Sequence, residues 1–216
     1  MLISVHIPKT GGTAFGAVLD RAFGDRLLRD YADRPLAHGS VARLASAAAA
    51  APFARGRLRG FDAVHGHFLP LKYRGAGGHV VTWLREPAQR IVSRYEHYRR
   101  DVAEGRALQP VRGLRPGLQL EEFIEIPRFH DTYAKYFRGF PLERVACFGF
   151  SEDMEGGLAR MGRRVGIDFG EALARRTNPL REGPSYDIPA SIAGRIARLN
   201  RGDYRLWDWA RRREGT

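Results

Sequence analysis

The chain begins with a short apolar run, MLISVHI, which passes through Pro8 and two adjacent glycines into the amphipathic stretch AFGAVLDRAF. The run has the length of a buried strand, whereas the apolar residues of 14–23 recur at helical spacing. Thr13 is the predicted N-cap of that helix. A strand, a tight turn and a helix in direct succession aim backbone N–H groups and the helix dipole at a ligand over the turn.

Strand and helix patterns then alternate along the chain, which predicts a mainly parallel sheet covered by helices on both faces. We expect one domain over residues 1–216. Residues 104–118 are rich in Gly, Pro and Arg, and they are predicted to be either a functional loop or disordered. The predicted strands are 61–67, 79–85 and 144–150, and the predicted helices are 38–50, 87–103, 120–126, 130–138, 151–166 and one or two within 189–213.

The net charge of +12 indicates an anionic partner, such as nucleic acid, an acidic glycan, anionic lipid or a polyphosphorylated cofactor. A genome biased toward arginine would produce the same excess without functional pressure. The single cysteine, Cys147, lies in the apolar run RVACFGF and is predicted to be a buried core residue rather than a nucleophile. Because neither a secretory signal nor an apolar run of membrane-spanning length is visible, we expect a cytoplasmic protein.

The loop IPKTGGT is the first candidate site. Gly11 and Gly12 allow the backbone to approach an anion, Thr10 and Thr13 add hydroxyl donors, and Lys9 adds a point charge. The usual P-loop has its lysine after the glycines, whereas here Lys9 precedes them. A plain strand-to-helix turn is the alternative, but the flanking strand and helix favour phosphate binding.

The second candidate site is WLREPAQRIVSRY, residues 83–95. Arg85 ends a predicted strand and Pro87 opens the next helix, so Arg85 and Ser93 are predicted to grip a second phosphate where open α/β sheets bind ligands. For Arg90 and Arg94 the alternative is a solvated helix face, which we favour for Arg94.

Together these motifs resemble the sulfotransferases that use 3′-phosphoadenosine 5′-phosphosulfate (PAPS). HIPKTGGTAF is similar to their 5′-phosphosulfate loop, and LREPAQRIVSRY is similar to their 3′-phosphate motif. VHGHF at 64–68 resembles the His-Gly-His of the heparan and dermatan uronyl 2-O-sulfotransferases, and FGFSEDMEGGLARMG resembles their late strand and acidic helix. The resemblance implies a P-loop NTPase-like three-layer α/β sandwich and in-line sulfuryl transfer from PAPS to an acceptor hydroxyl, with no required metal.

The resemblance also implies residue roles. Lys9 would neutralise charge on the bridging oxygen of the departing nucleotide. We favour His65 as the base, with His67 as a second acid/base group or an acceptor contact. His130 and Tyr133 are candidate acceptor contacts, although their spacing equally fits a packed helix. The implied donor-binding residues are Lys9, Thr10, Gly11, Gly12, Thr13, Phe15, Arg85, Ser93, Arg176 and Thr177, with Asn178 beside them.

The sequence departs from the animal members of that family, which are Golgi proteins with a membrane anchor, because its first strand starts at residue 2. We therefore expect a bacterial-type cytosolic enzyme whose acceptor is a saccharide, a glycolipid or a small molecule, and the basic composition favours an acidic one. Two other functions stay open. One is a P-loop nucleotide kinase, and the other is a basic nucleic-acid-binding module.

Overall fold

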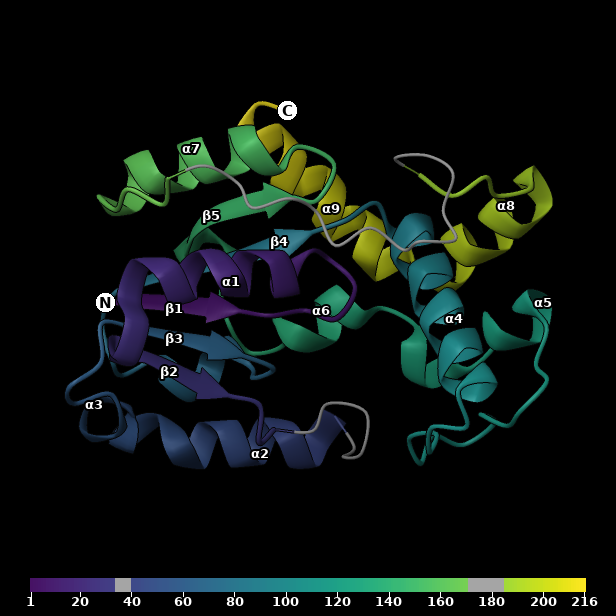
Figure 1. Ribbon diagram of the computed structural model, residues 1–216, viewed down its shortest axis with the longest axis horizontal. Coiled ribbons are helices and arrows are strands. Elements are labelled where there is room, and N and C mark those ends of the chain that lie inside the picture. Colours follow the sequence, from purple (N-terminus) through teal and green to yellow (C-terminus); the bar gives the residue numbers. More distant parts are fainter. Residues whose placement is uncertain (34–39, 171–184) are drawn as a thin grey trace.

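The computed structural model describes residues 1–33, 40–170 and 185–216. Its centre is a five-stranded, all-parallel sheet in the order β2-β3-β1-β4-β5 (Figure 1). The predicted α/β class, with helices flanking a parallel sheet, is confirmed. The strands are β1 (Leu2–Val5), β2 (Leu27–Asp30), β3 (Ala63–Gly66), β4 (His79–Leu84) and β5 (Val145–Phe150).

Helices lie on both faces of the sheet and beyond its carboxyl edge. None of those in the described residues combines the length and apolar character needed to cross a membrane. The helices are α1 (Gly12–Phe23), α2 (Ser40–Ala50), α3 (Ala54–Arg57), α4 (Pro87–Ala103), α5 (Leu120–Phe123), α6 (Thr132–Tyr136), α7 (Met154–Val165), α8 (Ala190–Leu199) and α9 (Arg201–Glu214).

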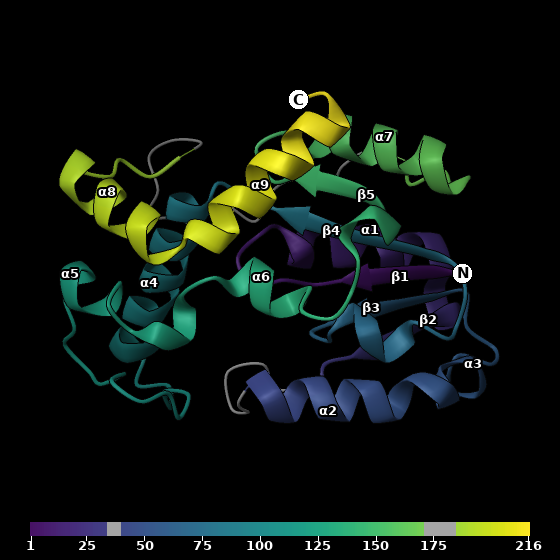
Figure 2. The same ribbon diagram turned by 180° about the vertical axis from the view of Figure 1, so that it is seen from behind.

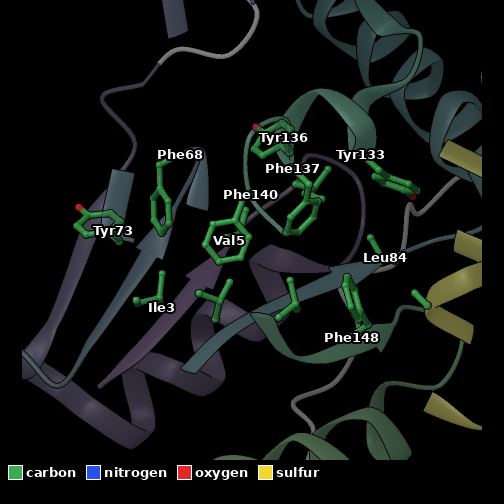
Figure 3. Packing of buried hydrophobic residues seen from close by; sticks show 14 of the residues in the cluster. Ile3, Val5, Phe68, Tyr73, Leu84, Tyr133, Tyr136, Phe137, Phe140 and Phe148 are labelled. Atoms are coloured by element: carbon green, nitrogen blue, oxygen red, sulfur yellow. The ribbon is translucent and has the colours of Figure 1, made fainter. Parts of the chain in front are cut away.

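The central strand β1 is buried on both sides, as expected for the middle of a parallel sheet. Leu2 packs with α1 and α7 on one face (Figure 1). Ile3 and Val5 pack on the other face, which α6 and α9 cover (Figure 2). Figure 3 shows the side chains of this second face meeting aromatic rings such as Tyr136 and Phe137.

Helices α4, α5 and α8 form a third apolar cluster beyond the arrowheads of the strands (Figure 1). The predicted irregular segment 104–118 belongs to it, because Val111 and Leu118 are buried there. The Tyr98 hydroxyl donates to the Arg115 carbonyl at 2.8 Å and accepts from the Leu118 amide at 2.8 Å. The segment is irregular as predicted, but it is packed rather than disordered.

Three local predictions were wrong. The strand β2 was missed because it is a four-residue edge strand with only its two end residues buried. Helix α1 begins at Gly12, with Gly11 rather than Thr13 as its N-cap, because Gly11 adopts a φ of 91° and turns the chain two residues earlier. The predicted helices at 120–126 and 130–138 are real but shorter, at Leu120–Phe123 and Thr132–Tyr136.

Candidate anion-binding site

The loop between β1 and α1 has an unusual backbone. Gly11 has a φ of 91°, and Lys9, which is not a glycine, has a φ of 71°. Such conformations cost free energy and are concentrated at functional sites. No side chain caps the start of α1, and its first turn holds no acidic residue. The N–H groups and positive dipole of this helix end are therefore available to an anion.

The loop residues predicted to bind the donor differ in their exposure. Thr10 is fully buried, and its hydroxyl donates to the Ile7 carbonyl at 2.8 Å, so it closes the loop from inside. Thr13 is exposed on the first turn of α1. Phe15 is fully buried against Trp83, so its side chain supports the loop through the core rather than lining its surface.

Position 12 has no space for a side chain, because the ring of His6 lies directly against it. A Cβ atom at Gly12 would lie 2.0 Å from Cδ2 of His6, far inside van der Waals contact. His6 is itself buried, so its ring has little room to move. A side chain at position 12 would therefore displace His6 and disturb the loop.

Lys9 is a partly buried cation surrounded by other cations. Within the described residues it forms no ion pair with a carboxylate. Burial, together with the positive charges of Arg100, Arg94 and Arg85, lowers the pKa of Lys9 from 10.5 to about 8. Asp101 offsets only part of this effect. The local excess of positive charge is what a bound anion would neutralise.

Two of these arginines lie on α4. Arg94 is partly buried, with its guanidinium 5.2 Å from the centre of the Phe129 ring. Burial and the charge of Arg90 lower the pKa of Arg94 to about 10. One guanidinium nitrogen of Arg100 is buried and has no hydrogen-bond partner among the described residues. Within the described ranges neither Arg94 nor Arg100 forms an ion pair. Because Arg94 is partly buried against Phe129, it does not lie on the solvated helix face that we favoured for it.

The predicted second anion site lies at the junction of β4 and α4. Arg85 directly follows β4, and its guanidinium lies 5.5 Å from the centre of the Tyr186 ring. Ser93 is buried two turns along α4. Arg90, in contrast, is buried and pairs with Asp203 at 3.1 Å, so it joins α4 to α9 instead of forming a solvated face.

The main chain of Arg85 is held by a hydroxyl. Tyr133 is fully buried, and its hydroxyl donates to the Arg85 carbonyl at 2.5 Å. His130 uses its Nε2 to donate to the Ile124 carbonyl at 2.7 Å. Both of these candidate acceptor contacts therefore hold the fold together, as the packed-helix alternative predicted.

The two predicted histidine bases differ in accessibility. His65 is fully buried, and its Nδ1 lies 2.7 Å from the Ser4 hydroxyl. Burial, together with Arg29 and His67, lowers its pKa to about 3. Its Nε2 is buried without a hydrogen bond of normal geometry, although the Gly12 backbone is close enough to influence it.

His67 is only partly buried, and its Nδ1 lies 2.6 Å from the His6 carbonyl oxygen. A carbonyl only accepts, so Nδ1 carries the hydrogen and Nε2 of the neutral ring keeps its lone pair. Burial lowers the pKa of His67 below its ordinary value, although the bond to His6 offsets part of the effect. His67 is therefore a neutral imidazole with its basic nitrogen unprotonated.

A third histidine and a tyrosine complete this cluster, and sequence reasoning missed both. The ring of His6 lies 5.0 Å from that of His65 and 4.4 Å from that of His67, and its Nδ1 is 3.0 Å from the Tyr31 hydroxyl. Burial and the two histidines lower the pKa of His6 to about 2. His6 could have been identified from the sequence, because it immediately precedes the loop. Tyr31 could not, because it follows the strand β2 that was not predicted.

Three predicted donor contacts, Arg176, Thr177 and Asn178, lie outside the described residues. Cys147 is buried in the core as predicted, and burial beside Glu214 raises the pKa of its thiol to about 12. In the part of the chain that the structure describes, no group of three or more His, Cys, Asp or Glu side chains is arranged to hold a metal ion.

The chain was compared with known proteins. No protein-family model matches it, and no curated protein matches it. What the structure establishes is a P-loop-like parallel α/β fold, in which Lys9 lies among arginine side chains after the first strand.

Proposed function

We propose that this protein is an O-sulfotransferase that moves a sulfuryl group from PAPS to a hydroxyl of an acceptor, a saccharide or a glycolipid. The observation that carries the proposal is Lys9. It lies in a positive-φ loop before the uncapped end of α1, with Arg94 and Arg100 near it and no carboxylate paired with it in the described residues. A cation in such surroundings is costly unless an anion joins it.

The chemistry of the donor fits this arrangement. PAPS has two anionic ends, a 5′-phosphosulfate and a 3′-phosphate. The loop and Lys9 would hold the first end, and Arg85 with Ser93 would hold the second. The exposed Thr13 adds a hydroxyl at the first end. Lys9 follows β1 and Arg85 follows the neighbouring strand β4, so two basic side chains are available at the carboxyl edge of the sheet for a donor with two anionic ends.

In this proposal, two residues of the chain act in the reaction: one accepts a proton, and the other neutralises a developing negative charge. His67 Nε2 accepts the proton of the acceptor hydroxyl, whose oxygen forms a new bond to sulfur while the bond from sulfur to the bridging oxygen breaks. Lys9 neutralises the negative charge that remains on that oxygen. We assign the base to His67 rather than His65 because His65 is fully buried and its Nδ1 is engaged by Ser4.

Isothermal titration with adenosine 3′,5′-bisphosphate, ATP with Mg²⁺ and a mixed oligonucleotide tests the proposal. We expect tight binding of the bisphosphate without metal. Arg85→Ala should weaken that binding by at least about tenfold, since charged hydrogen bonds contribute about 1.5–3 kcal/mol. The matched control is Arg163→Ala, an exposed arginine near the far end of α7.

Each alternative function predicts a different titration. Binding of ATP with Mg²⁺ alone would replace the proposal with a nucleotide kinase. Binding of the oligonucleotide alone, unaffected by Arg85→Ala, would replace it with a nucleic-acid-binding module. If the bisphosphate binds, an acceptor screen with isotope-labelled PAPS, followed by mass spectrometry, identifies the hydroxyl that is sulfated.

A further inference from the structure

The solvent-facing side of α2 carries no charged side chain. Val41 is 77% exposed, and the residues beside it on this face are small. The one charged residue of α2, Arg43, is only 6% exposed and pairs with Asp33 at 3.4 Å. A surface helix normally carries charged or amide side chains on its outer face. The exposed residues are Val41, Ala42, Ala45, Ser46, Ala48 and Ala49.

An exposed aromatic ring follows α2 closely in the chain. Phe53, at the end of the 3-10 turn Ala51–Phe53 that follows α2, is 73% exposed. Among the described residues, Val41 and Phe53 are by far the most exposed large apolar side chains. We call Phe53 and the exposed residues of α2 the α2 face. An apolar surface of this kind indicates an interaction site.

Basic side chains border this face, and acidic ones are missing from it. Arg55, Arg57 and Arg59 follow Phe53 directly and are all exposed. Only Arg57 lies near a carboxylate, 4.0 Å from Asp30, whereas in the described ranges Arg55 and Arg59 form no ion pair. The sequence contains no Asp or Glu between positions 34 and 61. Between positions 34 and 61, every exposed charged side chain in the described residues is therefore positive.

The α2 face lies on the outside of the molecule. Figures 1 and 2 both show α2 and α3 along the β2 side of the sheet, away from α4, α5 and α8. Helix α2 packs inward against the 3-10 turn Pro70–Tyr73, which leaves its opposite side to solvent. A broad, flat partner can therefore reach this face.

From this juxtaposition we infer that the α2 face docks on an anionic lipid bilayer. Phe53 and Val41 insert at the boundary between headgroups and acyl chains, and the arginines bind lipid phosphate and carboxylate groups. A second copy of the chain fits poorly, because two uniformly positive borders would repel each other. A nucleic acid would match the arginines but would gain nothing from burying Val41 and the alanines.

Vesicle co-sedimentation tests the inference. The full chain is mixed with phosphatidylcholine vesicles that contain about 30% phosphatidylserine, and separately with pure phosphatidylcholine vesicles, at about 0.15 M salt. We expect binding to the anionic vesicles and at least tenfold less binding to the neutral ones. Each basic residue near an anionic leaflet strengthens binding about fivefold, so Arg55→Ala with Arg59→Ala should weaken it about 25-fold.

Two further variants separate the apolar contribution from net charge. Phe53→Ser should weaken binding to anionic vesicles although it leaves the charge unchanged. Arg163→Ala with Arg205→Ala removes two exposed arginines from α7 and α9, and it should leave binding within about twofold. Because all these side chains are exposed, circular dichroism should show folded proteins.

Three outcomes would overturn the inference. The first is no binding of the native chain to anionic vesicles. The second is equal weakening by the two double-arginine variants, which would indicate attraction by overall charge alone. The third is binding of a mixed oligonucleotide that competes with vesicles and is insensitive to Phe53→Ser, which would identify the surface as a nucleic-acid site.

Discussion

Replacing Lys9 with methionine should stabilise the free protein while removing its response to the nucleotide. Methionine keeps the unbranched chain as far as the ε position and removes the charged amine. In the free protein that charge is partly buried near Arg94 and Arg100 and has no paired carboxylate among the described residues. Removing it relieves repulsion and desolvation, so the free energy of unfolding should rise.

The size of the effect follows from the pKa of Lys9. A fall from 10.5 to about 8 means that folding disfavours the protonated amine by about 3 kcal/mol. Screening by water at a partly exposed side chain reduces this to about 1–2 kcal/mol. At about 2–4 °C per kcal/mol for a chain of this length, the Tm of Lys9→Met should rise by about 2–8 °C.

The effect should depend on pH in one direction. Because the pKa of Lys9 is lower in the folded protein, the cost of its charge is fully present below about pH 8. The cost disappears as the pH rises from about 8 toward 10.5, where Lys9 loses its proton in both states. The stability difference between Lys9→Met and the native chain should therefore shrink over that range in urea-denaturation measurements.

The response to the ligand should have the opposite sign. At about 100 times its Kd, adenosine 3′,5′-bisphosphate should stabilise the native chain by about 2.7 kcal/mol, whereas Lys9→Met should lose most of this gain. Lys72→Met is the matched control, because Lys72 pairs with the buried Asp30 at 2.5 Å. It should lower stability and keep the response. A Lys9→Met protein that is less stable and still responds to the nucleotide would refute the reasoning.

Four other substitutions separate the roles of the residues in and around the site. His67→Ala should lower turnover by about 10²- to 10⁴-fold with the bisphosphate Kd unchanged, as measured by kinetics and titration. His65→Ala should instead lower the free energy of unfolding by about 1–3 kcal/mol, because it leaves the buried Ser4 hydroxyl unpaired; equal loss of turnover in both variants would reverse the assignment. Gly12→Ala should remove bisphosphate binding in titration, because its Cβ would meet His6 at 2.0 Å, and retained affinity would show that the loop tolerates the shift. Asp203→Asn should cost about 3–5 kcal/mol in urea denaturation, because it leaves Arg90 buried without its partner, yet bisphosphate binding below the transition should persist.

Secondary structure was predicted correctly from the sequence where a single local feature was strong. Buried strands such as β4 and β5 are continuous apolar runs, and α4 begins at Pro87 as predicted. The edge strand β2 was not readable, because its pairing with β3 comes from main-chain hydrogen bonds and only its two end residues are buried. The same miss concealed Tyr31, which follows that strand.

The candidate site was also predictable from the sequence only in part. Lys9, Gly11 and Gly12 lie within four residues, so their proximity is a property of the sequence. The sequence motif also contained Arg90 and Arg94, and from the motif alone we favoured a solvated helix face for Arg94. The fold buries Arg90 against Asp203, 113 residues away, whereas Arg94 lies close enough to Lys9 to lower the pKa of that lysine.

By itself, then, the sequence determined the alternation of strands and helices and the glycine loop with its lysine, because both depend on contacts between near neighbours. Only the tertiary structure decided which charges lack an opposite charge and which histidine keeps an accessible lone pair. Those properties depend on burial and on partners distant in the chain. His65 and His67 are two residues apart in the sequence, yet one is sealed in the core beside Ser4 and the other is not.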